Sequence, residues 1–235
     1  MLAGSLALLL PSQCEVCRGW GDALLCRACV ARHAPPRWRC RRCALVLPEN
    51  AAGGVCGACL HAPPPYERTV SALDYGFPWD RLVAAFKFQR RIDLARPLAA
   101  LLDDAIERAA DLPVPRLVVP VPLAPARLAE RGYNQAWELA RPLARRRGLR
   151  ALPDALQRVL EASAPQAALT RAQRQRNLRN AFAPSPNAPL AGADVALVDD
   201  VMTTGATAEQ AAAALLRGGS RSVQLWVLAR TPAPG

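Results

Sequence analysis

The sequence predicts an α/β protein in which a parallel sheet with flanking helices follows a small cysteine-rich module. Two apolar runs, residues 117–123 and 195–198, lack the polar alternation of a half-exposed strand, which is typical of strands buried on both faces. A helical pattern follows each run, in the order that parallel strands with crossover helices require. All eight cysteines lie within residues 14–59. We therefore expect a module at residues 1–62 and a larger domain at residues 66–232, joined by a proline run.

The cysteines form four C-x-x-C pairs: Cys14/Cys17, Cys26/Cys29, Cys40/Cys43 and Cys56/Cys59. A gap of two residues lets both sulfur atoms of a pair bind one ion, and eight thiolates fill two tetrahedral zinc sites. Segments this short need a metal to fold, and disulfides would need an oxidising compartment. We therefore predict a double zinc ribbon with two structural zinc ions. The spacing leaves both sequential and interleaved pairing of the knuckles open.

Residues 1–10 are apolar and are expected to form a short helix packed on its neighbours. They carry no basic residue, and no small-residue cleavage site precedes Cys14, so the pattern differs from that of a secretory signal. No apolar run is long enough to cross a bilayer. We expect a cytoplasmic protein with no membrane insertion.

The chain is strongly basic, with 30 Lys and Arg against 19 Asp and Glu and a formal net charge of +11. Such a charge favours polyphosphate or nucleic-acid ligands, although a solvated basic surface gives the same composition. Between the knuckles, Trp38 stands among Arg37, Arg39, Arg41 and Arg42. Zinc ribbons with basic and aromatic residues contact nucleic acid or dock on proteins, and the sequence leaves both open.

The hydrophobic pattern predicts the remaining elements of the larger domain. We expect strands at residues 70–75 and 223–229, and helices at residues 79–88, 95–110, 135–147 and 208–217. Asn134 is the expected N-cap of the helix at 135–147. Lys87, the single lysine of the chain, lies at the end of the helix at 79–88. It is either placed where an ammonium group is needed or is an ordinary solvated lysine at a helix end.

A contiguous motif follows the apolar run at 195–198. Asp199 and Asp200 stand at its carboxyl end, and Thr203, Thr204, Gly205, Ala206 and Thr207 then lead into the helix at 208–217. Ligands of open α/β sheets bind at the carboxyl ends of strands, and a helix N-terminus offers free N–H groups to a phosphate. Carboxylates suit ribose hydroxyls and Mg²⁺. The motif is neither a Walker loop nor a dinucleotide fingerprint, and it predicts a site for a phosphorylated ribose.

Three further features could contribute to a ligand site. Pro120, Val121, Pro122 and Leu123 form a proline-bounded turn at the end of the other apolar run, again at the ligand edge. Arg127 and Arg131 are four residues apart, so a helical turn would direct both at one anion. The polar stretch at 166–177 includes Arg171 and Arg174 and is either a solvated loop or a lid that closes on a diphosphate.

The motif VDDVMTTGAT at 198–207 closely resembles the site for 5-phosphoribosyl 1-pyrophosphate (PRPP) in type I phosphoribosyltransferases. From residue 9 to 230 the chain resembles the ComF family of phosphoribosyltransferase-like proteins. The resemblance rests on the four knuckles, Lys87-Phe88, PVPLAPARLAERGYNQ at 120–135, Gln166 and LTRAQRQRN at 169–177. It implies a type I phosphoribosyltransferase fold behind a double zinc ribbon.

The resemblance also implies roles for the matching positions. Asp199 and Asp200 would bind the ribose hydroxyls of PRPP·Mg²⁺, residues 203–207 would hold the 5′-phosphate, and the 120–123 turn with Arg127 and Arg131 would face the pyrophosphate. Family members are linked to natural transformation, where they handle single-stranded DNA with a helicase-like competence protein, or to the use of DNA as a nutrient. The acceptor stays open, as do two alternatives: a nucleobase salvage enzyme and a non-catalytic PRPP-sensing adaptor.

Overall fold

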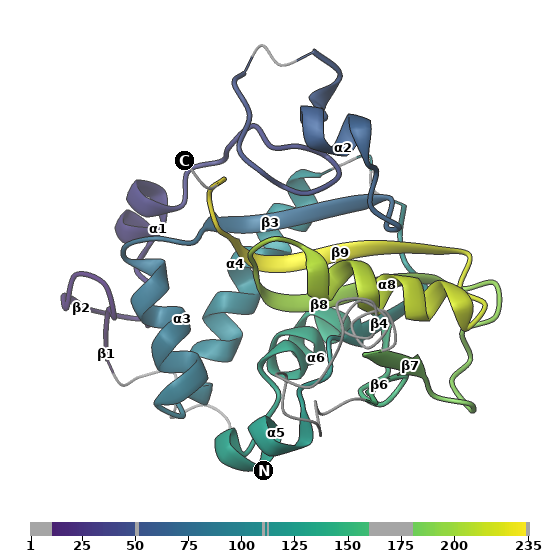
Figure 1. Ribbon diagram of the computed structural model, residues 1–235. Coiled ribbons are helices and arrows are strands. Elements are labelled where there is room, and N and C mark those ends of the chain that lie inside the picture. Colours follow the sequence, from purple (N-terminus) through teal and green to yellow (C-terminus); the bar gives the residue numbers. More distant parts are fainter. Residues whose placement is uncertain (1–10, 50–51, 110, 112, 160–180, 234–235) are drawn as a thin grey trace, which may run out of the picture.

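The computed structural model describes residues 11–49, 52–109, 111, 113–159 and 181–233. In this part of the chain, a five-stranded sheet has the order β3-β9-β8-β4-β5, and every neighbouring pair is parallel (Figure 1). Its strands are β3 (Arg68–Asp74), β4 (Leu117–Pro120), β5 (Arg150–Ala151), β8 (Asp194–Met202) and β9 (Ser222–Arg230). The predicted parallel sheet with flanking helices is confirmed.

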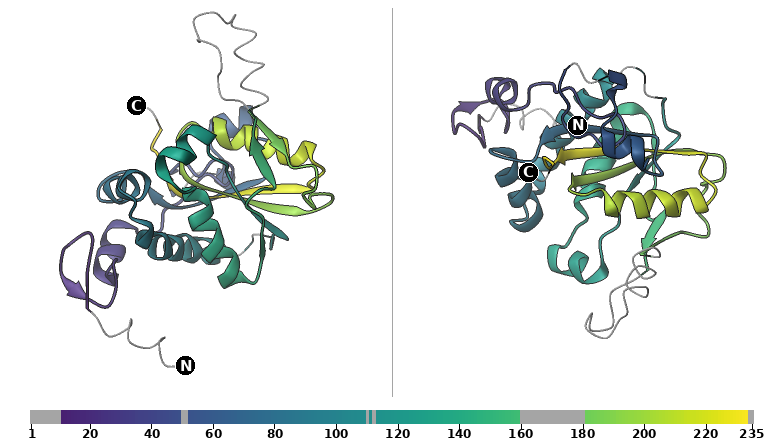
Figure 2. Two further views of the ribbon diagram at one scale, coloured as in Figure 1. Left: turned by 90° about the horizontal axis from the view of Figure 1, so that it is seen from below. Right: turned by 45° about the horizontal axis from the view of Figure 1, so that its top comes forward.

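Helices cover both faces of this sheet, as the two views of Figure 2 show. The helices of the domain are α3 (Trp79–Phe88), α4 (Ala95–Arg108), α5 (Pro125–Arg131), α6 (Gln135–Arg147) and α8 (Ala206–Arg217), with a single helical turn, η3, at Ile92–Leu94. Buried residues of α3, α4 and α6 form one hydrophobic core, and buried residues of α8 form a second. Two small antiparallel strands, β6 (Leu156–Arg158) and β7 (Phe182–Pro184), belong to the α8 side.

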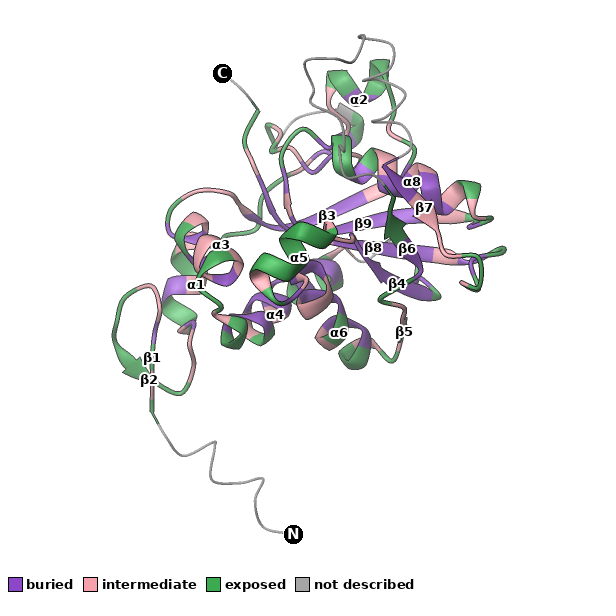
Figure 3. Ribbon diagram, turned by 60° about the horizontal axis from the view of Figure 1, so that its bottom comes forward, coloured by how far each residue is buried: buried purple, intermediate pink, exposed green. Residues whose placement is uncertain are grey.

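The apolar run at 195–198 serves both cores. Val195 and Leu197 pack with α8, whereas Ala196 and Val198 pack with the helices of the other face. Successive side chains of a strand point to opposite faces, so a strand covered on both sides has to be apolar at every position. Figure 3 shows the resulting buried sheet between its helices. This central position directs the end of β8 into the edge where ligands of α/β sheets bind.

Local sequence explains where helix α6 begins and ends. The Asn134 side chain accepts a hydrogen bond from the N–H of Ala136 at 3.0 Å, as an N-cap does, and Gly148 ends α6 in the left-handed conformation with φ 65°. Arg146 and Arg147 in the last turn of α6 both pair with Asp103 of α4, at 2.9 and 2.5 Å. The two helices are thereby joined on the same face of the sheet.

The cysteine-rich segment contains only short elements. They are β1 (Ser12–Gln13), β2 (Trp20–Gly21), α1 (Arg27–His33), η2 (Ala52–Gly54) and α2 (Gly57–His61). The first half of the segment lies beside α3 and the second half beside β3 (Figure 1). Leu25 joins the core of α3, α4 and α6, whereas Cys40, Cys43 and Cys59 join the core of α8. The two halves therefore contact different cores of the domain, and the expected boundary between residues 62 and 66 stays a prediction.

The second half of this segment also covers the start of the edge strand β3. The N–H of Thr69 donates to the carbonyl oxygen of Arg41 at 2.9 Å, and the Thr69 hydroxyl donates to the carbonyl oxygen of Arg42 at 2.5 Å. Because β3 is the first strand in the sheet order, these bonds satisfy polar groups that no neighbouring strand reaches.

Some element ends differ from the prediction. β8 continues to Met202, so Asp199 and Asp200 lie within the strand, because β9 pairs with it as far as Met202. β4 ends at Pro120, and α8 starts at Ala206 because Gly205 takes a left-handed conformation that caps the helix. The predicted helix at residues 1–10 lies outside the described residues.

Candidate functional site

Two carboxylates, Asp199 and Asp200, occupy successive positions near the end of β8. Asp200 is 8% exposed and Asp199 is half-buried. Asp199 Oδ1 accepts from the N–H of Asp200 at 2.8 Å, and Asp200 Oδ1 accepts from the N–H of Val201 at 2.6 Å. Burial and the neighbouring Asp200 charge raise the pKa of Asp199 to about 7. Such a pair holds negative charge that a cation or a set of hydroxyl donors would stabilise.

One cation already contacts this pair. Lys87, in the last turn of α3, places its Nζ 2.9 Å from Asp200 Oδ1, and its side chain is only 19% exposed. The interpretation of Lys87 as an ordinary solvated lysine is therefore wrong. The position of α3 follows from buried Phe86 and from Trp79, whose Nε1 donates to the carbonyl oxygen of His33 in the cysteine-rich segment at 2.7 Å.

The predicted phosphate-binding residues surround the start of α8. Thr203 and Thr204 are exposed, and Thr204 Oγ1 accepts from the N–H of Ala206 at 3.4 Å. Gly205 has φ 92°, a left-handed conformation that residues with a Cβ rarely adopt, so this turn favours glycine. Ala206 and Thr207 belong to the first turn of α8, where backbone N–H groups have no partner within the helix. The loop is thus built to offer backbone donors and hydroxyls to an anion.

Arg230, at the end of β9, is a residue of this site that the sequence analysis missed. It is buried, and its Nη1 donates to the carbonyl oxygens of Met202 at 3.2 Å and of Thr203. Its Nε donates to the carbonyl oxygen of Cys43 at 2.9 Å. The guanidinium therefore joins the Thr203 loop to the cysteine-rich segment. An arginine following an apolar strand was the available signal, but 29 arginines in one chain make it weak.

The turn after β4 lies beside β8. Val121 is buried and its N–H donates to the carbonyl oxygen of Val198 at 2.9 Å, while Pro122 and Leu123 are half-buried. Pro120 is the last residue of β4. The four residues therefore form the neighbouring part of the same sheet edge.

Arg127 and Arg131 lie on α5, the short helix that follows this turn. Arg131 is half-buried, and its guanidinium lies over the ring of Phe88, 4.8 Å from the ring centre. Phe88 is the residue that follows Lys87 in α3. Arg127 is exposed. The hydroxyl of Tyr133 donates to the carbonyl oxygen of Phe86, so the segment after α5 also contacts α3. The structure brings Arg131 to the helix that carries Lys87. Arg171 and Arg174 of the predicted lid lie outside the described residues.

The cysteines form two groups of four, and each group could hold one metal ion. Within each group the four sulfur atoms lie within 4.8 Å of one another. The groups are Cys14, Cys17, Cys26 and Cys29, and Cys40, Cys43, Cys56 and Cys59. The pairing is therefore sequential, and the interleaved alternative is wrong. Four sulfurs at such separations fit a tetrahedral ion with metal–sulfur distances of about 2.3 Å.

Backbone donors favour the thiolate at one sulfur atom of each group, Cys14 and Cys40. The N–H of Cys26 donates to Cys14 Sγ at 3.4 Å, and the N–H of Cys56 donates to Cys40 Sγ at 3.3 Å. Burial raises the pKa of the Cys14 and Cys40 thiols. Hydrogen bonds from backbone N–H groups outweigh this effect and lower the pKa of Cys14 to about 6 and that of Cys40 to about 7. All eight cysteines are free of disulfides.

Comparisons with known proteins identify the relatives of this chain. DNA utilization protein YhgH of Salmonella typhi is 38% identical over 233 residues, which cover 95% of this chain and 99% of the relative. The protein of the same name from Escherichia coli K12 is 36% identical with the same coverage. Competence protein F of Haemophilus influenzae is 38% identical over 180 residues, which cover 74% of this chain and 78% of the relative. The chain belongs to the ComF family.

Solved structures resemble this ComF protein over little more than half its length. The allosteric regulatory enzyme of purine biosynthesis matches with 18% identity and a TM-score of 0.39, covering 57% of this chain and 25% of the enzyme. The protein TT1426 of Thermus thermophilus matches with 22% identity and a TM-score of 0.36, covering 60% of this chain and 85% of that protein. No family model matches the sequence. Among the described residues of the ComF chain, no helix has the length and apolar character needed to cross a membrane.

Proposed function

We propose that this ComF protein binds PRPP together with Mg²⁺ at the carboxyl edge of the sheet, and that it acts in the uptake or use of DNA. The observation that carries the binding site is the order of residues along β8: Asp199 and Asp200, which pairs with Lys87, are followed by the Thr203–Thr207 turn that leads into α8. A phosphorylated ribose requires anion donors as well as carboxylates, and this end of the strand carries both.

Each residue of the site has a separate task in this proposal. The two carboxylates accept hydrogen bonds from the ribose hydroxyls, and the first-turn N–H groups of α8 with the Thr203 and Thr204 hydroxyls hold the 5′-phosphate. Arg131 and the Pro120–Leu123 turn face the pyrophosphate, with Arg127, Arg171 and Arg174 as further basic residues. Bound Mg²⁺ would neutralise diphosphate charge. The chain supplies positioning and charge stabilisation for loss of pyrophosphate, and no covalent nucleophile is needed.

The DNA-linked part of the proposal comes from the relatives. DNA utilization protein YhgH and Competence protein F carry that role in their names, and both match most of this chain. We propose single-stranded DNA and a helicase-like competence protein as partners. The two four-cysteine groups hold structural zinc, because neither has an open position for a substrate. Cysteines without disulfides at both sites agree with a cytoplasmic location.

Calorimetric titration of the zinc-loaded full chain with PRPP·Mg²⁺ tests the binding site. We expect the double variant Asp199→Asn/Asp200→Asn to lose binding and to keep its zinc. The matched control is Asp194→Asn/Asp111→Asn. It neutralises two carboxylates that pair with Arg221 and Arg68 at the opposite edge of the sheet, so it should bind PRPP as the parent does. Equal PRPP affinity in the parent and in a folded Asp199/Asp200 variant would disprove the site.

Two further measurements separate the remaining functions. Incubation with PRPP and each common nucleobase, scored by pyrophosphate release, identifies a salvage enzyme, whereas binding without release identifies a sensing adaptor. Deletion of the gene, scored for transformation and for growth on DNA, tests the pathway. Complementation with Asp199→Asn/Asp200→Asn then shows whether the pathway needs the phosphate site, and a deletion with no effect on either phenotype contradicts the DNA-linked role.

A further inference from the structure

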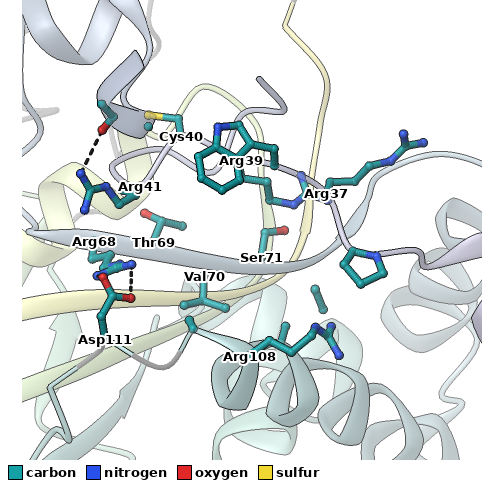
Figure 4. Close-up of a pocket in the computed structure, with 17 residues that line it drawn as sticks. Arg37, Arg39, Cys40, Arg41, Arg68, Thr69, Val70, Ser71, Arg108 and Asp111 are labelled. Atoms are coloured by element: carbon teal, nitrogen blue, oxygen red, sulfur yellow. Dashed lines mark hydrogen bonds and ion pairs between the residues drawn. The ribbon is translucent and has the colours of Figure 1, made fainter. Parts of the chain in front are cut away.

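A cleft of about 610 Å³ lies between the second cysteine group, the edge strand β3 and the end of α4. It is remote in sequence from the β8 motif, and none of the proposed PRPP-binding residues lines it. Five arginines line it instead: Arg37, Arg39, Arg41, Arg68 and Arg108. Figure 4 shows the labelled side chains around β3, with Arg37, Arg39 and Arg41 on one side of the strand and Arg108 on the other.

Two of these arginines are neutralised within the protein. Arg39 Nη2 lies 2.7 Å from Asp74 Oδ1, and the Arg39 side chain is 12% exposed. Arg68 donates through both terminal nitrogens to the two carboxylate oxygens of Asp111, at 2.6 and 2.5 Å. A bidentate pair of this kind holds its arginine in place and leaves little charge for a ligand. These two residues therefore shape the cleft.

The other three arginines keep their charge available. Arg37 is 53% exposed, and its Nε lies 3.6 Å from an oxygen of Asp74. The Asp74 carboxylate already pairs with Arg39 at 2.7 Å, so it does not neutralise Arg37 as well. Arg41 Nη2 donates to the carbonyl oxygen of Gly53 at 2.9 Å, which orients the guanidinium without neutralising it. Arg108 is exposed at the end of α4 and shows no ion pair within the described part of the chain. An anion entering the cleft meets three positive charges.

The arrangement of these charges fits a chain of phosphates better than a single phosphate. In Figure 4, Arg41 and Arg37 lie toward opposite ends of the view and Arg108 lies across β3 from both. One phosphate group would need donors that converge on a point, whereas a nucleic-acid backbone presents charges at intervals. Trp38 also lines the cleft and is 51% exposed, so about half of this aromatic side chain is accessible to a ligand. Stacking needs unpaired bases, which a single strand offers and a duplex hides.

We propose that this cleft binds single-stranded nucleic acid, with Arg37, Arg41 and Arg108 contacting phosphates and Trp38 stacking on a base. The inference rests on the proposed function, because a role in DNA uptake or use provides the single-stranded DNA that the cleft would bind. It adds a second site, separate from the carboxyl edge of the sheet, and assigns it to residues that the PRPP proposal does not use.

Fluorescence anisotropy with a labelled oligothymidine, measured on the zinc-loaded full chain over a range of salt concentrations, tests the cleft. The triple variant Arg37→Gln/Arg41→Gln/Arg108→Gln should bind more weakly, and its log–log salt dependence should be shallower by about 2, because each phosphate contact to a single strand contributes about 0.7. Trp38→Ala should weaken binding about tenfold at every salt concentration with an unchanged slope, and Trp38→Phe should restore most of the loss.

The matched control removes the same charge elsewhere. Arg96→Gln/Arg141→Gln/Arg145→Gln lies in the groove between α4 and α6 and should bind the oligothymidine as the parent does. Equal losses in both triple variants would assign binding to net charge and overturn the inference. Three other results would also overturn it. The first is that the parent shows no binding at low salt, and the second is that it binds a duplex more tightly than the single strand of equal length. The third result is that inorganic triphosphate competes with the labelled strand as strongly as unlabelled oligothymidine does.

PRPP titration of the same variants keeps the two proposals distinguishable. The cleft variants should bind PRPP·Mg²⁺ with the parent's affinity and keep their zinc and their melting temperature. Loss of oligothymidine binding together with unchanged PRPP affinity supports the cleft. If the parent binds oligothymidine but not PRPP, the phosphate site fails and the cleft stands.

Discussion

The buried guanidinium of Arg230 donates from Nε to the carbonyl oxygen of Cys43, 2.9 Å away. Cys43 belongs to the second four-cysteine group, and the same guanidinium donates from Nη1 to the carbonyl oxygen of Thr203 in the proposed phosphate loop. Tyr66 lies in the same buried core as Cys43, and its backbone carbonyl accepts a hydrogen bond from Arg42 at 3.4 Å. The backbone of the second cysteine group and the backbone of the Thr203 loop are thus bonded to one side chain.

Replacing this side chain should therefore loosen the loop. We expect Arg230→Met to lower PRPP·Mg²⁺ affinity about tenfold, because the Met202 and Thr203 carbonyls lose charged donors. Arg221→Met, at the exposed start of the same strand, is the matched control and should leave affinity unchanged. Calorimetric titration with parallel zinc analysis measures both. Unchanged PRPP affinity in Arg230→Met would show that the loop holds its position alone.

The two metal groups should contribute unequally to PRPP binding. Cys40→Ser and Cys17→Ser should each lower the zinc content from two ions to one, since each removes a ligand from one group. Only Cys40→Ser disturbs the knuckle that Arg230 contacts, so it should reduce PRPP affinity more strongly. Zinc analysis followed by titration checks this order. A larger loss in Cys17→Ser would contradict the link through Arg230.

The raised pKa of Asp199 predicts a pH dependence of stability in the protein without PRPP or Mg²⁺. Burial, then the Asp200 charge, raise this pKa from 3.8 to about 7, so between these values the unfolded chain releases a proton that the folded chain keeps. The free energy of unfolding should therefore fall as pH rises from about 4 to about 7. Asp199→Asn removes this fall and should raise Tm at pH 8 by roughly 10 °C, with little change at pH 4.

Thermal melts of the parent and of Asp199→Asn across this pH range provide the measurement. Asp194→Asn is the control on the same strand. Asp194 has its pKa lowered by hydrogen bonds from Arg221 and Ser222, so its replacement should lower Tm at pH 8 instead. Parallel curves for the parent and Asp199→Asn would show that Asp199 ionises as an ordinary carboxyl group.

Lys87 should stabilise the acidic pair before any ligand arrives. Its Nζ is 2.9 Å from Asp200 Oδ1, and both side chains are mostly buried. Lys87→Met leaves that charge unpaired and should cost up to about 3 kcal/mol of stability at pH 8. Arg81→Met, an exposed position of the same helix, should cost much less.

A double-mutant cycle with Asp200→Asn isolates the contact between Lys87 and Asp200. In the Asp200→Asn background, Lys87→Met should have little further effect on the denaturant midpoint. Full additivity of the two substitutions would mean that the ion pair contributes nothing to the folded state.

The parts of the candidate site that could be predicted from the sequence are those whose residues are contiguous along the chain. Asp199 to Thr207 is one run, and strand, acids, turn and helix follow in the order that a sheet edge requires. Lys87 was identifiable only because every other cationic side chain except histidine is arginine. Its partner could not be predicted, since α3 and β8 are far apart in sequence and meet through core packing.

Arg230 could not be predicted for a related reason. Its hydrogen bond to the Cys43 carbonyl joins residues 187 positions apart, and neither an arginine nor a cysteine in a sequence indicates such a contact. The short helices α1 and α2 were missed because the helical periodicity of a few residues is too weak to detect. The three-residue strands β6 and β7 are similarly too short for an alternating pattern.

The bond between the Thr69 N–H and the Arg41 carbonyl has one more consequence. It covers an outer strand whose next residues, Val70, Ser71 and Ala72, line an open cleft. If the proposed zinc ion of the second cysteine group were absent, this cover would be released and the bare strand edge would be open to other copies of the chain. We therefore expect zinc shortage to cause intermolecular strand pairing and aggregation.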